Sequence, residues 1–266
     1  MRRPSLPPAI VDNRFVARRF WLVFLPVFAC YQAAEGVGMR LLGSAVWQGM
    51  LMTATIPLAL LLGRRVYGNA AATFALERRA GAWRWLFGGL LLALAAKAAA
   101  WAVGQATGVY HVAPAALPAP GALLQAVALV LFTTIIPSLA EDMLTRGLWV
   151  RHGPLREGAG FVLLSTLVFV LNHIYRLANG PLEWLMLACF GLAYAAALAR
   201  SGTLWAAVGL HWGWNAANGL LGQFVDVDVL QRAPATLLSA SAHLVLLGIV
   251  LAVGGRSAKR QLAAPQ

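Results

Sequence analysis

The sequence predicts an all-α fold, a polytopic membrane helix bundle of about eight transmembrane helices. Hydrophobic residues make up 60% of the 266 positions and charged residues only 11%, which is too little charge to cover the surface of a soluble domain. Mean hydropathy is +0.71, and the apolar residues come in blocks of about 20, the length that spans a hydrocarbon core. Within lipid, such segments satisfy their backbone polar groups as helices.

The first three helices are expected at residues 20–39, 41–63 and 85–103. Only a short gap separates the first two, whereas an arginine-rich stretch, "GRRVYGNAAATFALERRAGAWR", separates the second from the third. Three prolines in "HVAPAALPAPG" then interrupt helical structure before the fourth segment, because proline lacks a backbone N–H and clashes inside a helix.

The polar stretches "RHGPLREG" and "DVDVLQRAP" are expected to be short turns between the later helices. These helices are predicted at residues 121–150, 158–178, 181–199, 202–224 and 235–254. No internal repeat and no composition shift divides the series, so we expect one transmembrane domain over residues 20–254.

Basic residues fall mainly in alternate loops, as the positive-inside rule expects. If the amino terminus is cytoplasmic, only Arg40, Arg176 and Arg232 lie outside. Eight crossings return the carboxyl terminus to the cytoplasm, which predicts cytoplasmic tails at residues 1–19 and 255–266. The inner set is Arg2, Arg3, Arg14, Arg18, Arg19, Arg64, Arg65, Arg78, Arg79, Arg84, Arg146, Arg151, Arg156, Arg200, Arg256, Lys259 and Arg260.

The net charge of +12 therefore follows from membrane orientation, and no nucleic-acid partner is expected. Cys30 and Cys189 both lie inside apolar segments and are expected to be packing residues without a disulfide. Lys97, deep in the third segment, has three open interpretations: it pairs with Glu35, lines a cavity or extends its amine to the interface.

Ionisable residues inside the fourth apolar segment are the strongest functional signal. Such groups are costly at membrane depth and mark functional sites. Asp142 and Arg146 are four residues apart, so they share a helix face beside Glu141 and can pair. A helix leaving the membrane at this point is the alternative, but the apolar "LWV" after Gly147 favours a helix that continues.

Two further segments carry histidines. His173 follows Phe169 by one turn in the fifth segment, and His211 precedes Asn215 by one turn in the seventh. Counting about 1.5 Å per residue from the inner ends places Glu141 roughly 14 Å deep, His211 roughly 12 Å and His173 roughly 22 Å. His173 therefore meets the others only if its helix tilts or starts later.

These residue types suit hydrolysis by activated water. A buried carboxylate can take a proton from water, and the resulting hydroxide-like oxygen can attack a carbonyl. Histidine and an amide can donate hydrogen bonds to the oxyanion that forms. The same histidines could instead bind zinc together with Glu141, although the chain has no HExxH spacing.

At these residues the chain resembles the CPBP intramembrane proteases, also called the ABI or CAAX-protease family, which includes the Ras-converting prenyl-protein endopeptidase. The family pattern is E-E-x-x-x-R, F-x-x-x-H and H-x-x-x-N/D on separate helices. This chain has Glu141-Asp142-x-x-x-Arg146, Phe169-x-x-x-His173 and His211-x-x-x-Asn215 in that order. Asp142 stands where the family usually has a second glutamate. The resemblance covers residues 120–220, which it implies to be the catalytic core.

The resemblance implies that Glu141 activates water and that His173 positions or polarises it. His211 and Asn215 would form the oxyanion site, and Arg146, next to Asp142, would hold the carboxylates. Phe169 belongs to the supporting set. Both metal-dependent and metal-independent mechanisms have been described for the family; we expect no required cofactor, with zinc on Glu141, His173 and His211 as the alternative.

The expected function is therefore intramembrane hydrolysis of a peptide bond in a membrane-anchored, prenylated or sorting-tail protein or peptide. The bilayer and that substrate are the expected partners, and a bacterial plasma membrane is the expected location. Two other functions stay open: a non-catalytic membrane protein, such as a bacteriocin-immunity protein, scaffold or transporter, and a bundle that binds haem through two histidines.

Overall fold

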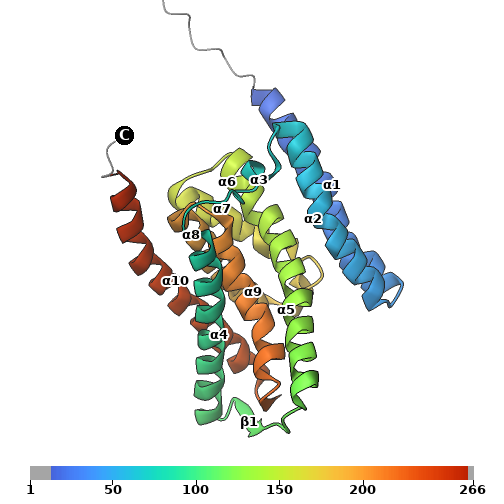
Figure 1. Ribbon diagram of the computed structural model, residues 1–266, viewed down its shortest axis with the longest axis vertical. Coiled ribbons are helices and arrows are strands. Elements are labelled where there is room, and N and C mark those ends of the chain that lie inside the picture. Colours follow the sequence, from blue (N-terminus) through green and yellow to red (C-terminus); the bar gives the residue numbers. More distant parts are fainter. Residues whose placement is uncertain (1–12, 263–266) are drawn as a thin grey trace, which may run out of the picture.

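The computed structural model describes residues 13–262, and these form a bundle of long helices (Figure 1). The elements are α1 (Asn13–Ala33), the π-helix η1 (Ala34–Leu41), α2 (Ala45–Tyr67), α3 (Ala70–Thr73), α4 (Ala82–Ala106), β1 (Tyr110–Pro114), α5 (Pro120–Asp142), the π-helix η2 (Met143–Gly147), α6 (Leu148–His152), α7 (Gly158–Asn172), the 3-10 helix η3 (Leu177–Asn179), α8 (Pro181–Ser201), α9 (Leu204–Leu221), β2 (Val225–Val229) and α10 (Arg232–Leu262).

Six helices in the described residues are long and apolar enough to cross a membrane. They span Ala17–Leu41, Ala45–Tyr67, Ala82–Ala106, Pro120–His152, Pro181–Ser201 and Arg232–Val253. The apolar helix α7 is shorter, and α9 carries the polar residues of the seventh segment. Each of the eight predicted segments coincides with a helix, so the all-α membrane bundle is confirmed. The number of membrane crossings and the side on which each terminus lies stay predictions.

The first two segments are separate helices, as predicted. Gly43 adopts a left-handed φ of 60° in the turn, and the Ser44 side chain caps α2 by accepting a hydrogen bond from the Trp47 amide at 3.3 Å. Figure 1 shows the resulting hairpin of α1 and α2 leaning away from the remaining helices, with α5 next to it.

The centre of the bundle is the contact between α4 and α9, and glycines make it possible. A Cβ on Gly209 would lie 2.3 Å from the Leu86 carbonyl oxygen, and one on Gly213 would lie 2.5 Å from that of Leu90. Only a residue without a side chain lets the two backbones come this close.

The helix of the fourth segment continues past its charges, as "LWV" indicated. α5 runs directly into η2 and α6, and Leu148 and Trp149 are buried. The π-helical turn begins directly after Asp142; π-bulges often occur at functional sites. A Cβ on Gly147 would meet the Phe74 carbonyl oxygen at 2.6 Å, so glycine here allows the chain after α3 to pack against the turn.

Two local predictions were wrong. The stretch "DVDVLQRAP" is not only a turn, because Val225–Val229 pairs antiparallel with Tyr110–Pro114 in a two-stranded ribbon. Valine and aspartate alternate there, and this period of two with β-branched residues favours a strand. The fifth helix ends at Asn172 instead of continuing to residue 178, so His173 follows the helix and does not lie inside it.

The predicted tails at the two chain ends are partly helical. Helix α1 begins at Asn13 and α10 extends to Leu262, so helix occupies part of 1–19 and of 255–266. Residues 1–12 and 263–266 of those tails lie outside the described part of the chain. Cys30 and Cys189 are free thiols, as expected.

Candidate active site

Three separate helical segments bring one carboxylate and two imidazoles together. Glu141, at the end of α5, is 4% exposed. Its Oε1 lies 3.5 Å from Nδ1 of His173, which follows α7, and its Oε2 lies 3.8 Å from Nε2 of His211 on α9. The depth difference that helical rise suggested does not keep His173 away from the other two side chains.

Asp142 anchors the same centre from the neighbouring position. Its Oδ1 accepts a hydrogen bond from Arg146 and lies 3.2 Å from His211 Nδ1. Asp142 and Arg146 are completely buried, so the predicted i, i+4 pair forms inside the protein and Arg146 does not extend to the interface. Within the described residues, the Arg146 guanidinium makes no ion pair with Glu141; it bonds to Asp142 and, at 3.0 Å, to the Thr145 hydroxyl.

Aromatic rings enclose the Arg146 guanidinium. Its Cζ lies 4.5 Å from the Phe169 ring centroid and 5.1 Å from that of Tyr194. The Tyr194 ring also stacks on His211 with centroids 5.0 Å apart. Phe169 therefore supports the site through its ring, because a desolvated cation is attracted to aromatic faces.

The partners of the two histidines define which nitrogen carries a proton. His173 Nδ1 lies 2.8 Å from the Phe169 carbonyl oxygen, which can only accept, so Nδ1 is the donor. His211 Nδ1 faces the Asp142 carboxylate, which likewise accepts. The Asp142 carboxylate fixes the orientation of His211, so that Nε2 points at Glu141.

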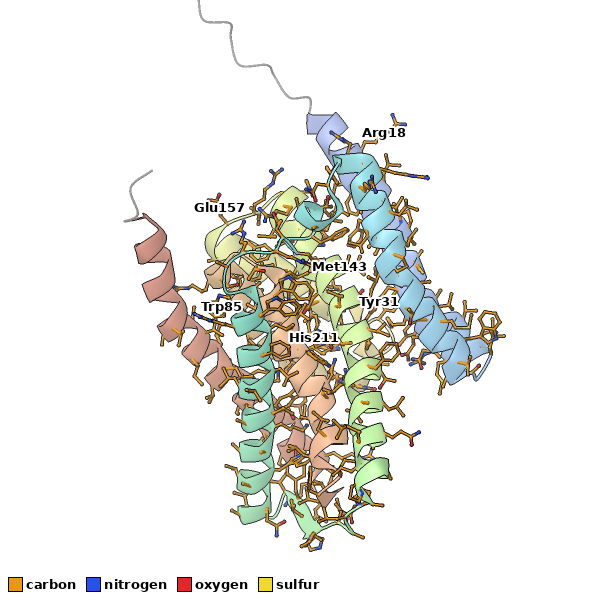
Figure 2. The ribbon with its side chains drawn as sticks, viewed as in Figure 1. Arg18, Tyr31, Trp85, Met143, Glu157 and His211 are labelled. Atoms are coloured by element: carbon orange, nitrogen blue, oxygen red, sulfur yellow. The ribbon has the colours of Figure 1, made fainter. Side chains whose placement is uncertain are left out.

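Sequence reasoning missed three polar residues that support Glu141, either directly or through a neighbouring side chain. Asn172 is buried, and its amide donates to Glu141 Oε1 at 3.2 Å. Gln32 of α1 in turn donates to Asn172 Oδ1 at 2.9 Å. Tyr31, labelled in Figure 2, comes from the same helix and interacts with both Glu141 and Asn172. A glutamine buried in the first apolar segment was the signal for this support.

Asn215 lies one turn beyond His211 but is not in contact with Glu141. Its amide donates to the Ser138 hydroxyl of α5 at 3.0 Å, and its side chain is exposed. The structure therefore places Asn215 beside the centre, and the second N–H of its amide nitrogen makes no hydrogen bond to the described residues.

The described residues do not assemble a metal site. No group of three or more His, Cys, Asp or Glu side chains among residues 13–262 is arranged to hold a metal ion. His173 presents Nδ1 to Glu141, and that nitrogen carries its proton toward the Phe169 carbonyl. A metal ligand must offer a lone pair, so His173 cannot bind a metal through Nδ1 in this arrangement.

An apolar groove lies between α2 and α5 and ends near this centre. Its volume is about 780 Å³. It is lined by Ala45, Val46, Gln48, Gly49, Met50, Met52, Thr53, Ala54, Pro57, Phe132, Thr133, Ile136 and Pro137. Pro137 precedes Glu141 by one helical turn, about 6 Å along the axis.

The long apolar helices define the class of this chain, a multi-pass membrane protein. Residues 123–217 match the family model described as Type II CAAX prenyl endopeptidase Rce1-like. This stretch is similar to that family of CAAX prenyl endopeptidases and contains all three motifs, so the resemblance seen in the sequence is confirmed. No curated protein and no solved structure matches the chain.

Proposed function

We propose that the chain is an intramembrane endopeptidase of a bacterial plasma membrane that cleaves a membrane-anchored or prenylated protein or peptide. The observation that carries the proposal is the position of Glu141 between two imidazoles. Its Oε1 lies 3.5 Å from the nearest ring nitrogen of His173, and its Oε2 lies 3.8 Å from that of His211. At such distances one water molecule can bridge the carboxylate and the rings.

The chemistry follows from these positions. Glu141 takes a proton from water while the water oxygen bonds to the carbonyl carbon of the scissile peptide. The Nε2–H group of His211, which Asp142 orients, and the amide of Asn215 donate to the oxyanion. The carbon–nitrogen bond then breaks, and the proton held by Glu141 passes to the leaving nitrogen, which yields one carboxylic acid and one amine. His173 orients the water, and no step requires a metal.

The groove between α2 and α5 supports a lipid-borne substrate. Its lining is mainly apolar. Figure 1 shows that the α1–α2 hairpin leans away from α5, and the groove lies between α2 and α5. A prenyl group or an apolar helix can enter such a groove from the bilayer at low cost, because its surface leaves one apolar environment for another. The family match over residues 123–217 supports the prenylated class of substrate.

The test is cleavage of a farnesylated peptide ending in a C-a-a-X sequence by the purified full-length protein in lipid nanodiscs. Mass spectrometry identifies the products, with and without a strong chelator, and His211→Ala serves as the inactive control. We expect cleavage that chelation leaves unchanged. Loss of activity on chelation, restored by zinc, would support the metal alternative. Absence of cleavage of any lipidated or transmembrane peptide would favour a non-catalytic role.

A further inference from the structure

A buried histidine of α10 contacts the helices that surround the candidate active site, and the chemistry proposed above does not use it. Helix α10 lies at the edge of the bundle (Figure 1) and packs against α8. It follows residues 123–217, which match the family model. His243, near the middle of its apolar span, has no exposed surface. A completely buried imidazole is costly unless its nitrogens have hydrogen-bond partners.

Both ring nitrogens of His243 have such partners. Nδ1 lies 2.9 Å from the Ser239 carbonyl oxygen, which can only accept, so Nδ1 carries a proton. In the neutral ring Nε2 then offers its lone pair, and the Tyr194 hydroxyl, 2.8 Å away, donates to it. Among residues 13–262, His243 is the only hydrogen-bond partner of that hydroxyl.

Two aromatic rings hold the His243 ring in position. Phe190 of α8 stacks on it, with centroids 3.5 Å apart and an angle of 22° between the planes. Trp214 of α9 meets it edge to face, with centroids 4.4 Å apart. The acceptor atom for Tyr194 is therefore fixed by contacts among three helices, α8, α9 and α10.

Lys97 of α4 packs against the same tryptophan but gives His243 no hydrogen bond. Its Nζ lies 4.4 Å from the Trp214 ring centroid, and no described residue forms a hydrogen bond or ion pair with it. Glu35 pairs with Arg40 instead, so the predicted Lys97–Glu35 pair does not form. Lys97 lines a cavity of about 400 Å³, so the cavity-lining interpretation holds.

Tyr194 connects the fixed acceptor to the active site. Its ring is completely buried and stacks on His211, labelled in Figure 2, with centroids 5.0 Å apart. The ring centroid also lies 5.1 Å from Cζ of Arg146. Stacking alone lets one ring slide over another, whereas a hydrogen bond at the hydroxyl adds a preferred distance and direction.

We propose that His243 is a positioning residue for His211 and acts through the Tyr194 hydroxyl. The inference rests on the proposed function, in which the Nε2–H group of His211 donates to the oxyanion. Such a donor works only if it already points to the place where the negative charge develops. Loss of the His243 acceptor should therefore lower kcat and leave KM unchanged, because the interaction that weakens is made in the transition state.

A double-mutant cycle in the farnesyl-peptide assay tests this link. Tyr194→Phe removes the hydroxyl, and His243→Phe removes the acceptor but keeps an aromatic ring. Each variant should lower kcat about 10-fold, and the double variant should also be about 10-fold slower instead of about 100-fold, because both changes break the same hydrogen bond. His243→Gln retains an acceptor and should keep most of the activity. His111→Phe, the same exchange at an exposed position of β1, should have no effect.

Nuclear magnetic resonance of the full-length protein with ¹⁵N-labelled histidine, in detergent micelles, tests the link without any reaction. The His211 signal, assigned with His211→Ala, should shift in His243→Phe and stay unchanged in His111→Phe. In a protein that already carries Tyr194→Phe, the further exchange His243→Phe should leave the His211 signal where it is, because the connecting hydroxyl is gone.

Effects on kcat that multiply in the double variant, or a His211 signal that does not respond to His243→Phe, would overturn the proposal. If His243→Phe does not fold, full activity of Tyr194→Phe would overturn it as well, since that variant lacks only one oxygen atom. The expected shift of the His211 signal in a protein that cleaves no peptide would refute the endopeptidase function and leave the link between His243 and His211 standing.

Discussion

The Nδ1 atom of His211 lies 3.2 Å from Oδ1 of Asp142, the same oxygen that accepts the hydrogen bond from Arg146. The second acidic residue of the motif thus acts on the histidine of another helix and not on Glu141 directly. Aspartate is long enough for this contact, although the family usually has glutamate at this position.

Replacing Asp142 by Asn should therefore impair catalysis more than folding. An amide lacks the charge with which Asp142 holds the His211 ring in place, so kcat should fall about 10- to 100-fold, the value of a charged hydrogen bond. Asp142→Glu keeps the charge and should retain more activity. Steady-state cleavage of the farnesylated peptide measures both variants, and equal kcat values for Asp142→Asn and the unaltered protein would contradict the assigned role.

The buried pair of Arg146 and Asp142 should matter for stability. Arg146→Met leaves Asp142 charged and without its partner at a site with no solvent exposure, which should cost about 3–5 kcal/mol. The matched control is Arg151→Met, because Arg151 pairs with Glu77 at 2.8 Å with both side chains about a third exposed, where loss costs about 0–1 kcal/mol. In detergent, the unfolding temperature should fall more for Arg146→Met than for Arg151→Met. A smaller fall for Arg146→Met would be inconsistent with the buried pair.

The close contact of α4 and α9 should not tolerate a methyl group. In Gly213→Ala the new Cβ would lie 2.5 Å from the Leu90 carbonyl oxygen, and overpacking of this kind costs about 1–3 kcal/mol. Gly88→Ala is the control, because a Cβ there meets nothing within 4 Å and alanine is favoured over glycine in a helix by about 0.5–1 kcal/mol. Unfolding temperatures should therefore move in opposite directions. A higher unfolding temperature for Gly213→Ala would contradict the close contact between α4 and α9.

Asn172 should contribute to activity through Glu141. Asn172→Ala removes the donor to Oε1, so the carboxylate loses a fixed orientation and kcat should fall about 10-fold. Asn179→Ala changes an exposed asparagine a few residues later and should have no effect. Peptide cleavage under identical conditions compares them, and similar rates for the two variants would argue against the Asn172 contact.

The centre was predictable because ionisable residues at membrane depth are rare and follow helical spacing. Glu141, Asp142 and Arg146 stood out in one apolar segment, and two further segments each offered a histidine. Their meeting point could not be calculated from depth, because helical rise gives position along an axis and not the direction of that axis. His173 was therefore estimated about 8 Å too far from Glu141 to meet it.

The supporting residues were harder to foresee because they come from distant parts of the chain. Gln32 and Asn172 are 140 residues apart, and neither has a charge that would mark it in an apolar segment. Tyr194, whose ring stacks on His211, is held in the same way. Its hydroxyl forms a 2.8 Å hydrogen bond with His243, which joins α8 to α10. The ribbon was missed because five alternating residues between two helices resemble a polar turn.

The most direct test of the central claim compares Glu141→Gln with Glu35→Gln in cleavage of the farnesylated peptide. Glutamine fills the same space but cannot take a proton, so Glu141→Gln should lower kcat by about 10²–10⁴-fold without lowering the unfolding temperature. Glu35, exposed and paired with Arg40, should be replaceable without loss. Activity that survives in Glu141→Gln would show that this carboxylate is not the base.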